Sequence, residues 1–462
     1  MKRTFTALAA ALLLAAAMAV PAAASDYDAV AEDLSAIGVF RGTSDGFELD
    51  RAPTRSEAAI MLVRLYGAEE EAQAAYEAGD ITLPFTDVGT TAAPYVAWLY
   101  DQGIVNGTSA TTYGTGACSA QNYAAFLLRA LGYQDGTDFQ YADALTFAQE
   151  KGFYDPIQFS GAFLRDDLAA VTYQALGTDL KDGSTYLLKS LIDSGAVDAT
   201  AAAPMTEKIE AYRALQQAGA GVDGTAMDAD VDADITVSYN GQVSEDMSMR
   251  MSGNMKVAVT EDDVQLAYMM DIDALGETMT MGEWMTDGWV YVQTEVGGET
   301  VRTKTQVTSE EMQALLEQAQ STATAAAPAN SVSGLAMVES ITRTTSGANT
   351  VYTVVIGQNS MGSMMDSILG LLGTDAGTDL SGMEDILGGM EFSDITAVYT
   401  VGSDGRLRDM QMQYATTMNM DGETVETAYD MTVTVNATGS DVTIAFPDFS
   451  GFQEVTVPET TD

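Results

Sequence analysis

The sequence contains no histidine and only one cysteine, Cys118. Without histidine, Ser-His-Asp catalysis, Cys-His catalysis and zinc sites built on imidazole are excluded. Cys118 has no second cysteine to pair with, so an internal disulfide is excluded as well. No segment after residue 24 is apolar for long enough to cross a bilayer, and the sequence therefore predicts no transmembrane span.

Basic residues are also scarce, since 20 Lys and Arg stand against 67 Asp and Glu and give a formal charge of −47. A surface of this sign repels nucleic acids and anionic lipids, so we expect no nucleic-acid partner. Cys118 lies too far from the start of the chain to carry an N-terminal lipid, and no Leu-Pro-x-Thr-Gly sorting signal is present. We therefore expect either a free protein or one attached non-covalently.

The first 24 residues have the pattern of a secretory signal peptide. Lys2 and Arg3 precede an apolar run from Phe5 to Val20, and three alanines end at Ala24. This order of positive, apolar and small residues predicts cleavage after Ala24 and hence secretion. The alternative, a membrane anchor, is disfavoured because the run is short for a bilayer span.

Residues 25–200 contain three imperfect copies of one helical unit, at about 26–67, 85–132 and 139–177. Each copy consists of a helix, a glycine-containing loop and a second helix that closes on glycine. The loop and closing glycines are 29 residues apart in the first two copies and 25 apart in the third: Gly38 and Gly67, Gly103 and Gly132, Gly152 and Gly177. Units this small cannot bury their own apolar faces, so we expect the copies to pack together.

The second helix of the first copy shows the expected local signals. Thr54 and Glu57 form a capping box, in which each side chain accepts a hydrogen bond from the other residue's backbone amide. Apolar side chains then recur at helical spacing, at Ala58, Met61, Leu62 and Leu65. Gly67 supplies the left-handed residue that ends the helix.

In combination, these motifs resemble the S-layer homology (SLH) family. The first copy carries Gly38, Gly42, Asp45-Gly46 and Thr54-Arg55-Ser56-Glu57, and the second carries Phe85, Asp87, Trp98, Gly103 and Gly107. The resemblance implies an all-α bundle of three repeats arranged as a pseudo-threefold spindle. It also implies attachment at the cell surface, through binding of an anionic secondary cell-wall polysaccharide, often pyruvylated, in grooves between repeats.

Arginine suits such a ligand because its planar guanidinium forms forked hydrogen bonds with a carboxylate. Counting 13 residues back from each closing glycine aligns Thr54 with Ser119 and Leu164. The next position then aligns Arg55 with Ala120 and Arg165, so only one or two grooves are expected to bind. Arg55 also begins a helix, where anions are favoured, whereas Arg64 is expected to pair with nearby acids. Trp98 is expected either to stack on a sugar or to fill the core. The polysaccharide-binding candidates are Arg41, Asp45, Gly46, Arg55, Glu57, Asp87, Trp98, Gly107 and Arg165.

The second half changes from helical to alternating periodicity. Residues 201–227 predict a last helix and a linker, residues 228–455 a β-rich domain, and residues 456–462 a tail. Apolar residues alternate with polar ones at Ile235, Val237 and Tyr239, at Met247, Met249 and Met251, at Met279 and Met281, at Met410, Met412 and Tyr414, and at Met431, Val433 and Val435. This pattern predicts antiparallel strands with one buried face. Hairpin turns are predicted at Asp287-Gly288, Asp404-Gly405 and Asp421-Gly422, and helices at 309–320 and 361–372.

The expected fold is thus multidomain α + β, with an all-α N-terminal bundle and a C-terminal antiparallel sheet carrying one or two helices. That pattern resembles the LolA/LppX-like carrier fold, which implies a hydrophobic small molecule or lipid between sheet and helices. Methionines suit an adaptable apolar cavity, although they equally fill an ordinary core. Asp228, Asp230, Asp232 and Asp234 are interpreted as a charged strand edge, because the glycine and glutamate of a calcium loop are missing.

No motif indicates a catalytic residue, a cofactor or a metal site. The sequence favours a non-enzymatic protein of the cell surface, with a β-domain of binding or structural role. The main alternative is an envelope carrier for a hydrophobic ligand, in which the repeat region has become purely structural. A carboxylate-based hydrolase stays open as a third class, since no spacing singles out a catalytic pair among 67 acids.

Overall fold

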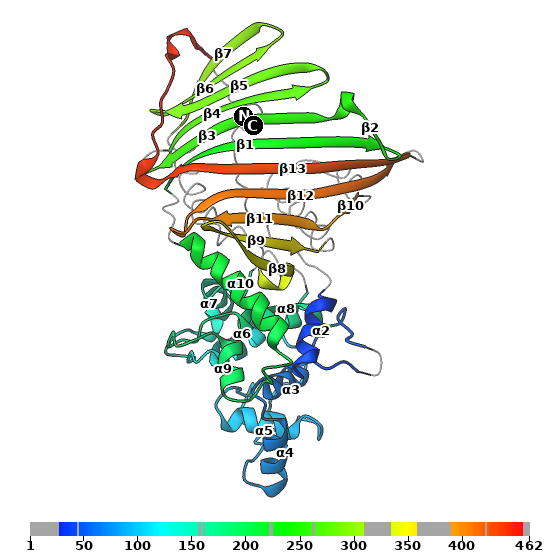
Figure 1. Cartoon of the computed structure of the whole chain (residues 1–462). Coiled ribbons are helices and arrows are strands. Elements are labelled where there is room, and N and C mark those ends of the chain that lie inside the picture. Colours follow the sequence, from blue (N-terminus) through cyan, green and yellow to red (C-terminus); the bar gives the residue numbers. More distant parts are fainter. Residues whose placement is uncertain are drawn as a thin grey trace, which may run out of the picture.

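The protein is described by a computed structural model that places residues 27–43, 46–155, 159, 162–220, 225–260, 264–308, 334–357, 390–420 and 423–455. Several predictions fall outside these ranges: the signal peptide 1–24, the tail 456–462, the helices at 309–320 and 361–372, the turn Asp421-Gly422, and Asp45. Within them, helices fill the N-terminal part and an antiparallel sheet the C-terminal part (Figure 1), which confirms the predicted α + β fold class.

The helical part follows the predicted repeats closely. The first repeat holds α2 and α3, the second α5 and α6, and the third α7 and α8, while α4, α9 and α10 add to them. Their bounds are α2 (Asp28–Ala36), α3 (Arg55–Leu65), α4 (Glu69–Ala78), α5 (Ala93–Asp101), α6 (Ala120–Ala130), α7 (Ala144–Glu150), α8 (Arg165–Leu176), α9 (Leu187–Asp193) and α10 (Ala203–Ala220). A short 3-10 helix, η1 (Tyr141–Asp143), precedes α7.

The glycines have the conformations that the repeat pattern predicts, with one exception. All three loop glycines and the closing glycines of the first two repeats have positive φ, including +64° at Gly67. The capping box of Thr54 and Glu57 is present, and the four predicted apolar residues of α3 are buried. Gly177 closes the third repeat with φ −85°, so the helix there ends without a left-handed residue.

The β-domain is one sheet, with strand order β14-β7-β6-β5-β4-β3-β1-β13-β12-β11-β9-β8. Two meanders meet at its centre, where β1 pairs with β13. The strands are β1 (Ala226–Tyr239), β2 (Gln242–Val243), β3 (Met249–Val259), β4 (Val264–Ala274), β5 (Glu277–Thr286), β6 (Trp289–Val296), β7 (Glu299–Gln306), β8 (Val338–Ser346), β9 (Asn349–Ile356), β10 (Met390–Phe392), β11 (Ile395–Val401), β12 (Leu407–Met420), β13 (Glu423–Thr438) and β14 (Gln453–Glu454). All pairs are antiparallel except that of β14 with β7.

Sequence signals placed most strands but erred in detail. The turn at Asp287-Gly288 joins β5 to β6 with φ values of +52° and +74°, as a two-residue hairpin requires. Met247, predicted in a strand, instead lies in the 3-10 helix η2 (Glu245–Met247) and is 51% exposed. The acidic run on β1 is not a strand edge, because β1 pairs with β3 and β13 on its two sides.

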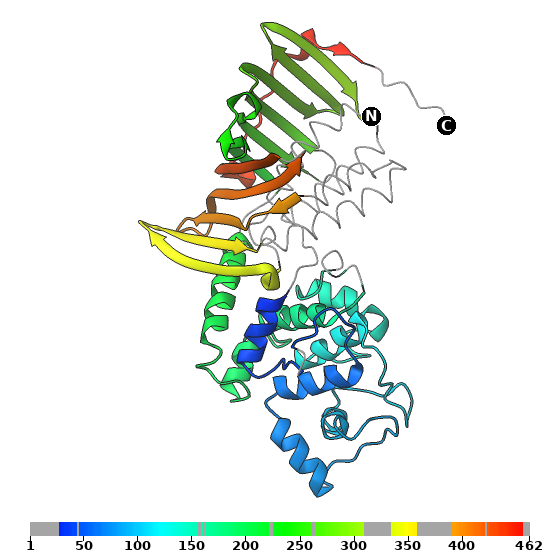
Figure 2. The same ribbon diagram turned by 90° about the vertical axis from the view of Figure 1, so that its right-hand side faces the viewer.

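Helix α10 joins the two parts of the molecule, so most of the predicted linker 201–227 is a packed helix. Ile209 and Leu215 of α10 are fully buried, and α10 contacts β8. On the repeat side, Arg213 donates to the Gly177 carbonyl at 2.6 Å and pairs with Asp179 at 2.6 Å. One apolar cluster consequently runs from the repeats through α10 into β8, β9, β11 and β12. Figure 2 shows α10 beside the β8–β9 hairpin.

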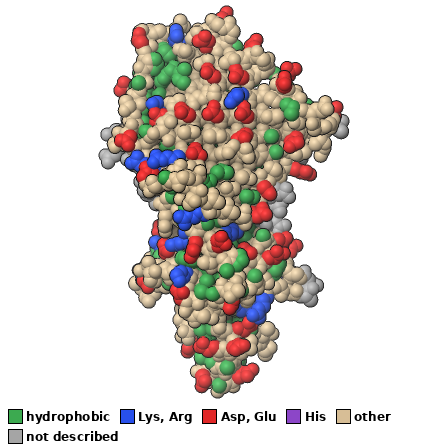
Figure 3. Space-filling model, viewed as in Figure 1, with side chains coloured by type: hydrophobic (Ala, Val, Ile, Leu, Met, Phe, Trp, Pro, Cys, Tyr) green, Lys and Arg blue, Asp and Glu red, His purple; other side chains and the backbone are tan. Residues whose placement is uncertain are grey.

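A second apolar cluster lies apart from the first, on one face of β3, β4, β5 and β6. Its buried members are Met255, Val264, Leu266, Tyr268, Met270, Met285 and Val290. Acidic side chains are abundant on the side of the molecule seen in Figure 3. Figure 3 shows Asp and Glu over the whole visible face, with Lys and Arg gathered near its middle, where sheet and helices meet.

Candidate functional site

The three repeats meet at the starts of their second helices. α3, α6 and α8 begin directly after Thr54, Ser119 and Leu164, which confirms the alignment counted from the closing glycines. The segment before α3 joins the other two repeats through its backbone. The Arg55 amide donates to the Gly116 carbonyl at 2.9 Å, and the Arg165 amide donates to the Arg51 carbonyl at 2.9 Å. The expectation that the copies pack together is therefore confirmed.

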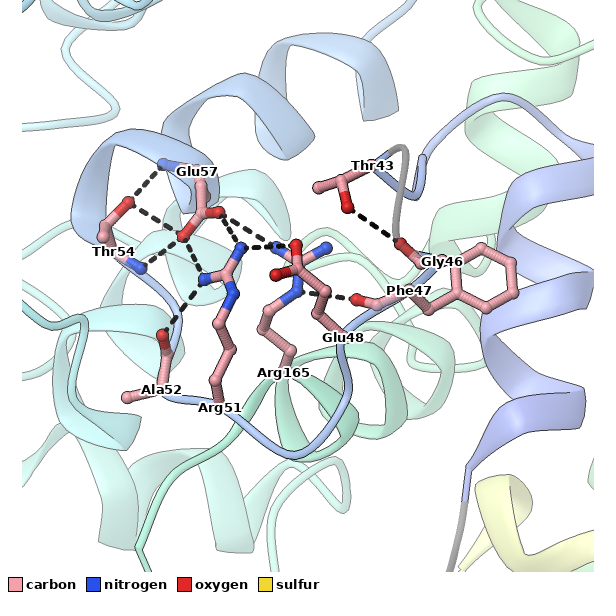
Figure 4. A network of polar contacts seen from close by, with 9 residues as sticks. All are labelled: Thr43, Gly46, Phe47, Glu48, Arg51, Ala52, Thr54, Glu57 and Arg165. Carbon is pink, nitrogen blue, oxygen red and sulfur yellow. Dashed lines mark hydrogen bonds and ion pairs between the residues drawn. The ribbon is translucent and has the colours of Figure 1, made fainter.

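At the junction of repeats 1 and 3, Glu57 is the centre of a polar network (Figure 4). Its carboxylate accepts from Arg51 at 2.6 Å and 3.1 Å, from Arg165 at 3.3 Å, and from the Thr54 amide at 2.8 Å. Arg51 also pairs with Glu48 at 3.2 Å. Burial alone would raise the pKa of Glu57, but the hydrogen bonds from Arg51 and Thr54 and the charge of Arg165 lower it to about 2.

Arg165 is buried inside this network, so the structure does not present this predicted polysaccharide ligand at the surface. The residue is 5% exposed, its Nε donates to the Phe47 carbonyl at 2.9 Å, and its guanidinium lies 4.9 Å from the Phe40 ring. Burial lowers the pKa of Arg165, opposed by the nearby Glu57 carboxylate. Two arginines and two glutamates neutralise each other here, which leaves the junction no charge for an anionic ligand. Glu57 is likewise occupied in structural contacts.

Arg55 at the junction of repeats 1 and 2 is in a different position. Its guanidinium lies 4.7 Å from the Tyr113 ring and 5.6 Å from the Phe126 ring. One terminal nitrogen donates to the Asn122 side chain, the other to the Asn106 carbonyl at 3.0 Å, and Nε has no partner. Of the arginines that the structure describes between residues 27 and 220, only Arg55 lacks a carboxylate within 4.0 Å.

The other arginines of repeat 1 are paired. Arg41 is half exposed and bonds Glu69 at 2.9 Å, and Arg64 bonds the same carboxylate at 3.2 Å, which confirms the pairing expected of Arg64. Glu69 also accepts from the Tyr95 hydroxyl at 2.7 Å. The pKa of Glu69 is lowered by these hydrogen bonds and charges against the opposing effect of burial.

Four further candidates have structural contacts. Trp98 is only 8% exposed and donates to Glu71 at 3.2 Å, so it belongs to the core and does not offer a stacking surface for a sugar. Asp87 accepts from the amides of Tyr113 and Gly114 at 2.7 Å and 2.8 Å, and thereby fixes the loop before α6. Gly107 packs beneath Phe85. Gly46 closes a tight turn through a backbone pair with Thr43.

The surroundings of Arg55 contain residues that the sequence did not single out. Asn122 donates to the Tyr141 hydroxyl at 2.8 Å, and Tyr141 is 42% exposed. Asn106 could have been found from the sequence, because it directly precedes Gly107 in the loop of the second repeat. Asn122 carried no signal, because it lies 67 positions from the Arg55 side chain that it contacts.

Comparison with known families agrees with this helical architecture. The S-layer homology domain family matches residues 84–117, the first helix and loop of the second repeat. The chain is therefore an SLH-domain protein, of a class associated with the cell surface or cell wall and binding cell-wall polysaccharide in general. A second family, a family of unknown function (DUF6612), matches residues 208–460 and hence more than half the sequence, so the chain belongs to it.

No curated protein matches the chain. Neither family match tests the resemblance of the second half to the LolA/LppX-like carriers, which stays a prediction. Within the described residues, no helix combines the length and apolarity that a bilayer crossing needs.

Proposed function

We propose that this is a secreted, non-enzymatic protein, held on the cell wall by an anionic polysaccharide bound at the junction of repeats 1 and 2. The observation that carries the proposal is the uncompensated guanidinium of Arg55 in a chain of net charge −47. Tyr113 and Phe126 hold the guanidinium in place, and Asn106, Asn122 and Tyr141 surround it with polar groups. Each terminal nitrogen of Arg55 carries a second N–H besides the one bonded to Asn122 or Asn106, and this pair of donors can bind a sugar carboxylate through two parallel hydrogen bonds.

The junction of repeats 1 and 3 contributes framework instead of a second binding point. Its guanidinium groups already bond Glu48 and Glu57, and an incoming carboxylate would have to displace these partners. Repeat 2 has Ala120 at the position of Arg55, so no arginine projects from the start of α6. We therefore infer a single anionic binding point for each chain.

Replacing Arg55 with alanine is expected to weaken retention on purified cell walls by about tenfold, because one charge-assisted fork is lost. Arg55→Lys keeps the positive charge but lacks the forked donors, so its affinity for cell walls should lie between those of the original protein and Arg55→Ala. The full chain should be used, since α10 packs on both the repeats and the sheet. Co-sedimentation over a range of wall concentrations gives the affinities.

Lys189→Ala is a matched control, since it also removes one positive charge from the helical part, at a half-exposed side chain on α9. It should bind walls as the original protein does, and circular dichroism should show all variants folded. Arg55→Ala binding as tightly as the original protein would contradict the role of Arg55. An original protein that stays in the supernatant would contradict anchoring altogether.

A second candidate function, the carrying of a hydrophobic ligand by the β-domain, is favoured by the cluster on β3–β6. Beside its buried members, Met227, Met251 and Met281 pack against it, so that six methionines meet on this face. Methionine side chains adapt to irregular apolar ligands because they are unbranched and polarisable. In this reading the repeats hold the carrier at the wall.

A further inference from the structure

One ionisable side chain interrupts the methionine face of the β-domain. Glu283 of β5 follows the alternation of Met281 and Met285, so it points to the same face of the sheet. Its cross-strand neighbours are Tyr268 on β4 and Val292 on β6, both members of the second apolar cluster. Glu283 is therefore surrounded by apolar and aromatic side chains on three adjacent strands. These strands, β4, β5 and β6, lie in the upper part of the sheet in Figure 1.

The carboxyl group of Glu283 is buried without a partner. The residue is 1% exposed, and neither carboxylate oxygen has a hydrogen-bond partner. The hydroxyl of its cross-strand neighbour Tyr268 donates instead to the Met270 sulfur at 2.7 Å. A buried polar group costs stability unless a partner satisfies it, so both oxygens are open to a hydrogen-bond donor that the fold does not provide.

Among the described residues of strands β3 to β7, no lysine or arginine points to this face of the sheet. The one lysine on the neighbouring part of β3, Lys256, points to the opposite face, where it pairs with Asp228 at 2.5 Å. The sequence has no Lys or Arg between Lys304 and Arg343, or between Arg343 and Arg406. Burial raises the pKa of Glu283 to about 7, since no positive charge stabilises its ionised form.

We propose that this methionine face binds an amphiphile with an aliphatic chain and an ammonium headgroup, and that the ammonium pairs with the Glu283 carboxylate. The inference rests on the second candidate function and specifies its ligand. The aliphatic chain packs among Met255, Met270 and Met285, which are buried on the same face. The ammonium supplies both the charge and the donors that the carboxyl group lacks, and a buried pair of this kind discriminates strongly against ligands without the donor.

Dodecylamine and 1-dodecanol are suitable probes, because they share a chain and differ in the headgroup. Binding to the full-length protein is measured by isothermal titration calorimetry at pH 7.5 and 150 mM salt. We expect dodecylamine to bind the original protein at least tenfold more tightly than Glu283→Gln. 1-Dodecanol should bind both proteins equally, because glutamine keeps the shape of the site.

Glu277→Gln is the matched control, since Glu277 lies on the same strand but is exposed, and it should bind dodecylamine as the original protein does. Weaker dodecylamine binding by Glu277→Gln would show attraction to the acidic surface and overturn the assignment. Equal binding of amine and alcohol to the original protein would overturn the role of Glu283 but leave an apolar ligand site standing. If neither probe binds, both the assignment and the carrier function are wrong.

Discussion

Replacing Glu283 with glutamine is expected to remove a pH-dependent loss of stability from the β-domain. The pKa of Glu283 is about 7 in the folded protein, against an ordinary value of 4.5 when the chain unfolds. Between these two values the folded state binds more protons than the unfolded state, so the free energy of unfolding decreases as pH rises. Above about pH 7 both states are ionised and the loss is complete. The difference between the two pKa values corresponds to about 3 kcal/mol.

Glutamine has the same shape and carries no charge. The free energy of unfolding of Glu283→Gln should therefore increase relative to that of the original protein as pH rises from 5 to 8. Urea unfolding at several pH values, followed by tryptophan fluorescence, measures this gain. The pKa of Asp167 in α8 is also raised to about 7, chiefly by burial, but Asp167 is common to both proteins and cancels in the comparison. Glu277→Gln should show no such trend, and parallel pH curves for the original protein and Glu283→Gln would refute the expectation.

Gly107→Ala is expected to lower the free energy of unfolding by about 3 kcal/mol, near the upper end of the usual cost of overpacking. A Cβ at this position would lie 2.3 Å from the Phe85 ring, 2.5 Å from the Ser109 carbonyl oxygen and 2.6 Å from that of Thr112. The two carbonyls belong to the backbone of one turn, where Ser109 donates to Thr112 at 3.2 Å, so they cannot move independently. Thermal unfolding followed by circular dichroism measures the loss.

Gly116→Ala provides the matched comparison, because Gly116 lies in the same repeat and a Cβ there meets no atom within 4 Å. This variant should unfold within about 0.5 kcal/mol of the original protein. Equal stability of the two variants would show that Gly107 has no packing role. Gly107 would then return to the set of candidate ligand contacts.

Local sequence signals predicted the helical repeats well because the interactions behind them span few residues. The capping box of Thr54 and Glu57 spans three positions, and the glycines of positive φ mark the ends of their helices. The same holds for the hairpin at Asp287-Gly288, whose two residues alone determine the turn. Fold class and the arrangement of repeats therefore follow from the sequence.

The candidate site was less predictable, because its contacts join residues far apart in the chain. Arg165 bonds the Phe47 carbonyl across 118 positions, and this contact buries a side chain that the repeat alignment made equivalent to Arg55. Motif equivalence gave the two arginines one role, whereas nearby acids neutralise only Arg165. Trp98 is likewise removed from the surface by its contacts with Glu71 and Tyr66.

Glu283 carried a signal that alternation alone could have revealed. Met279 and Met281 were assigned to a buried face, and continuing the same period through Met285 places Glu283 on that face too. An acid at an apolar position of a strand is thus a marker worth following in related sequences. Whether such an acid lacks a partner depends on strands β4 and β6, and only the fold brings these together.

Helix α10 has a mechanical consequence for a protein held at one end. It packs against both the repeats and β8, so the helical part and the sheet cannot rotate freely relative to each other. A drag force on the sheet is therefore transmitted as a torque to the attachment point. Under the proposed anchoring at repeats 1 and 2, the sheet is held at a set angle to the wall. A single attachment sugar would be under load whenever fluid moves past the cell.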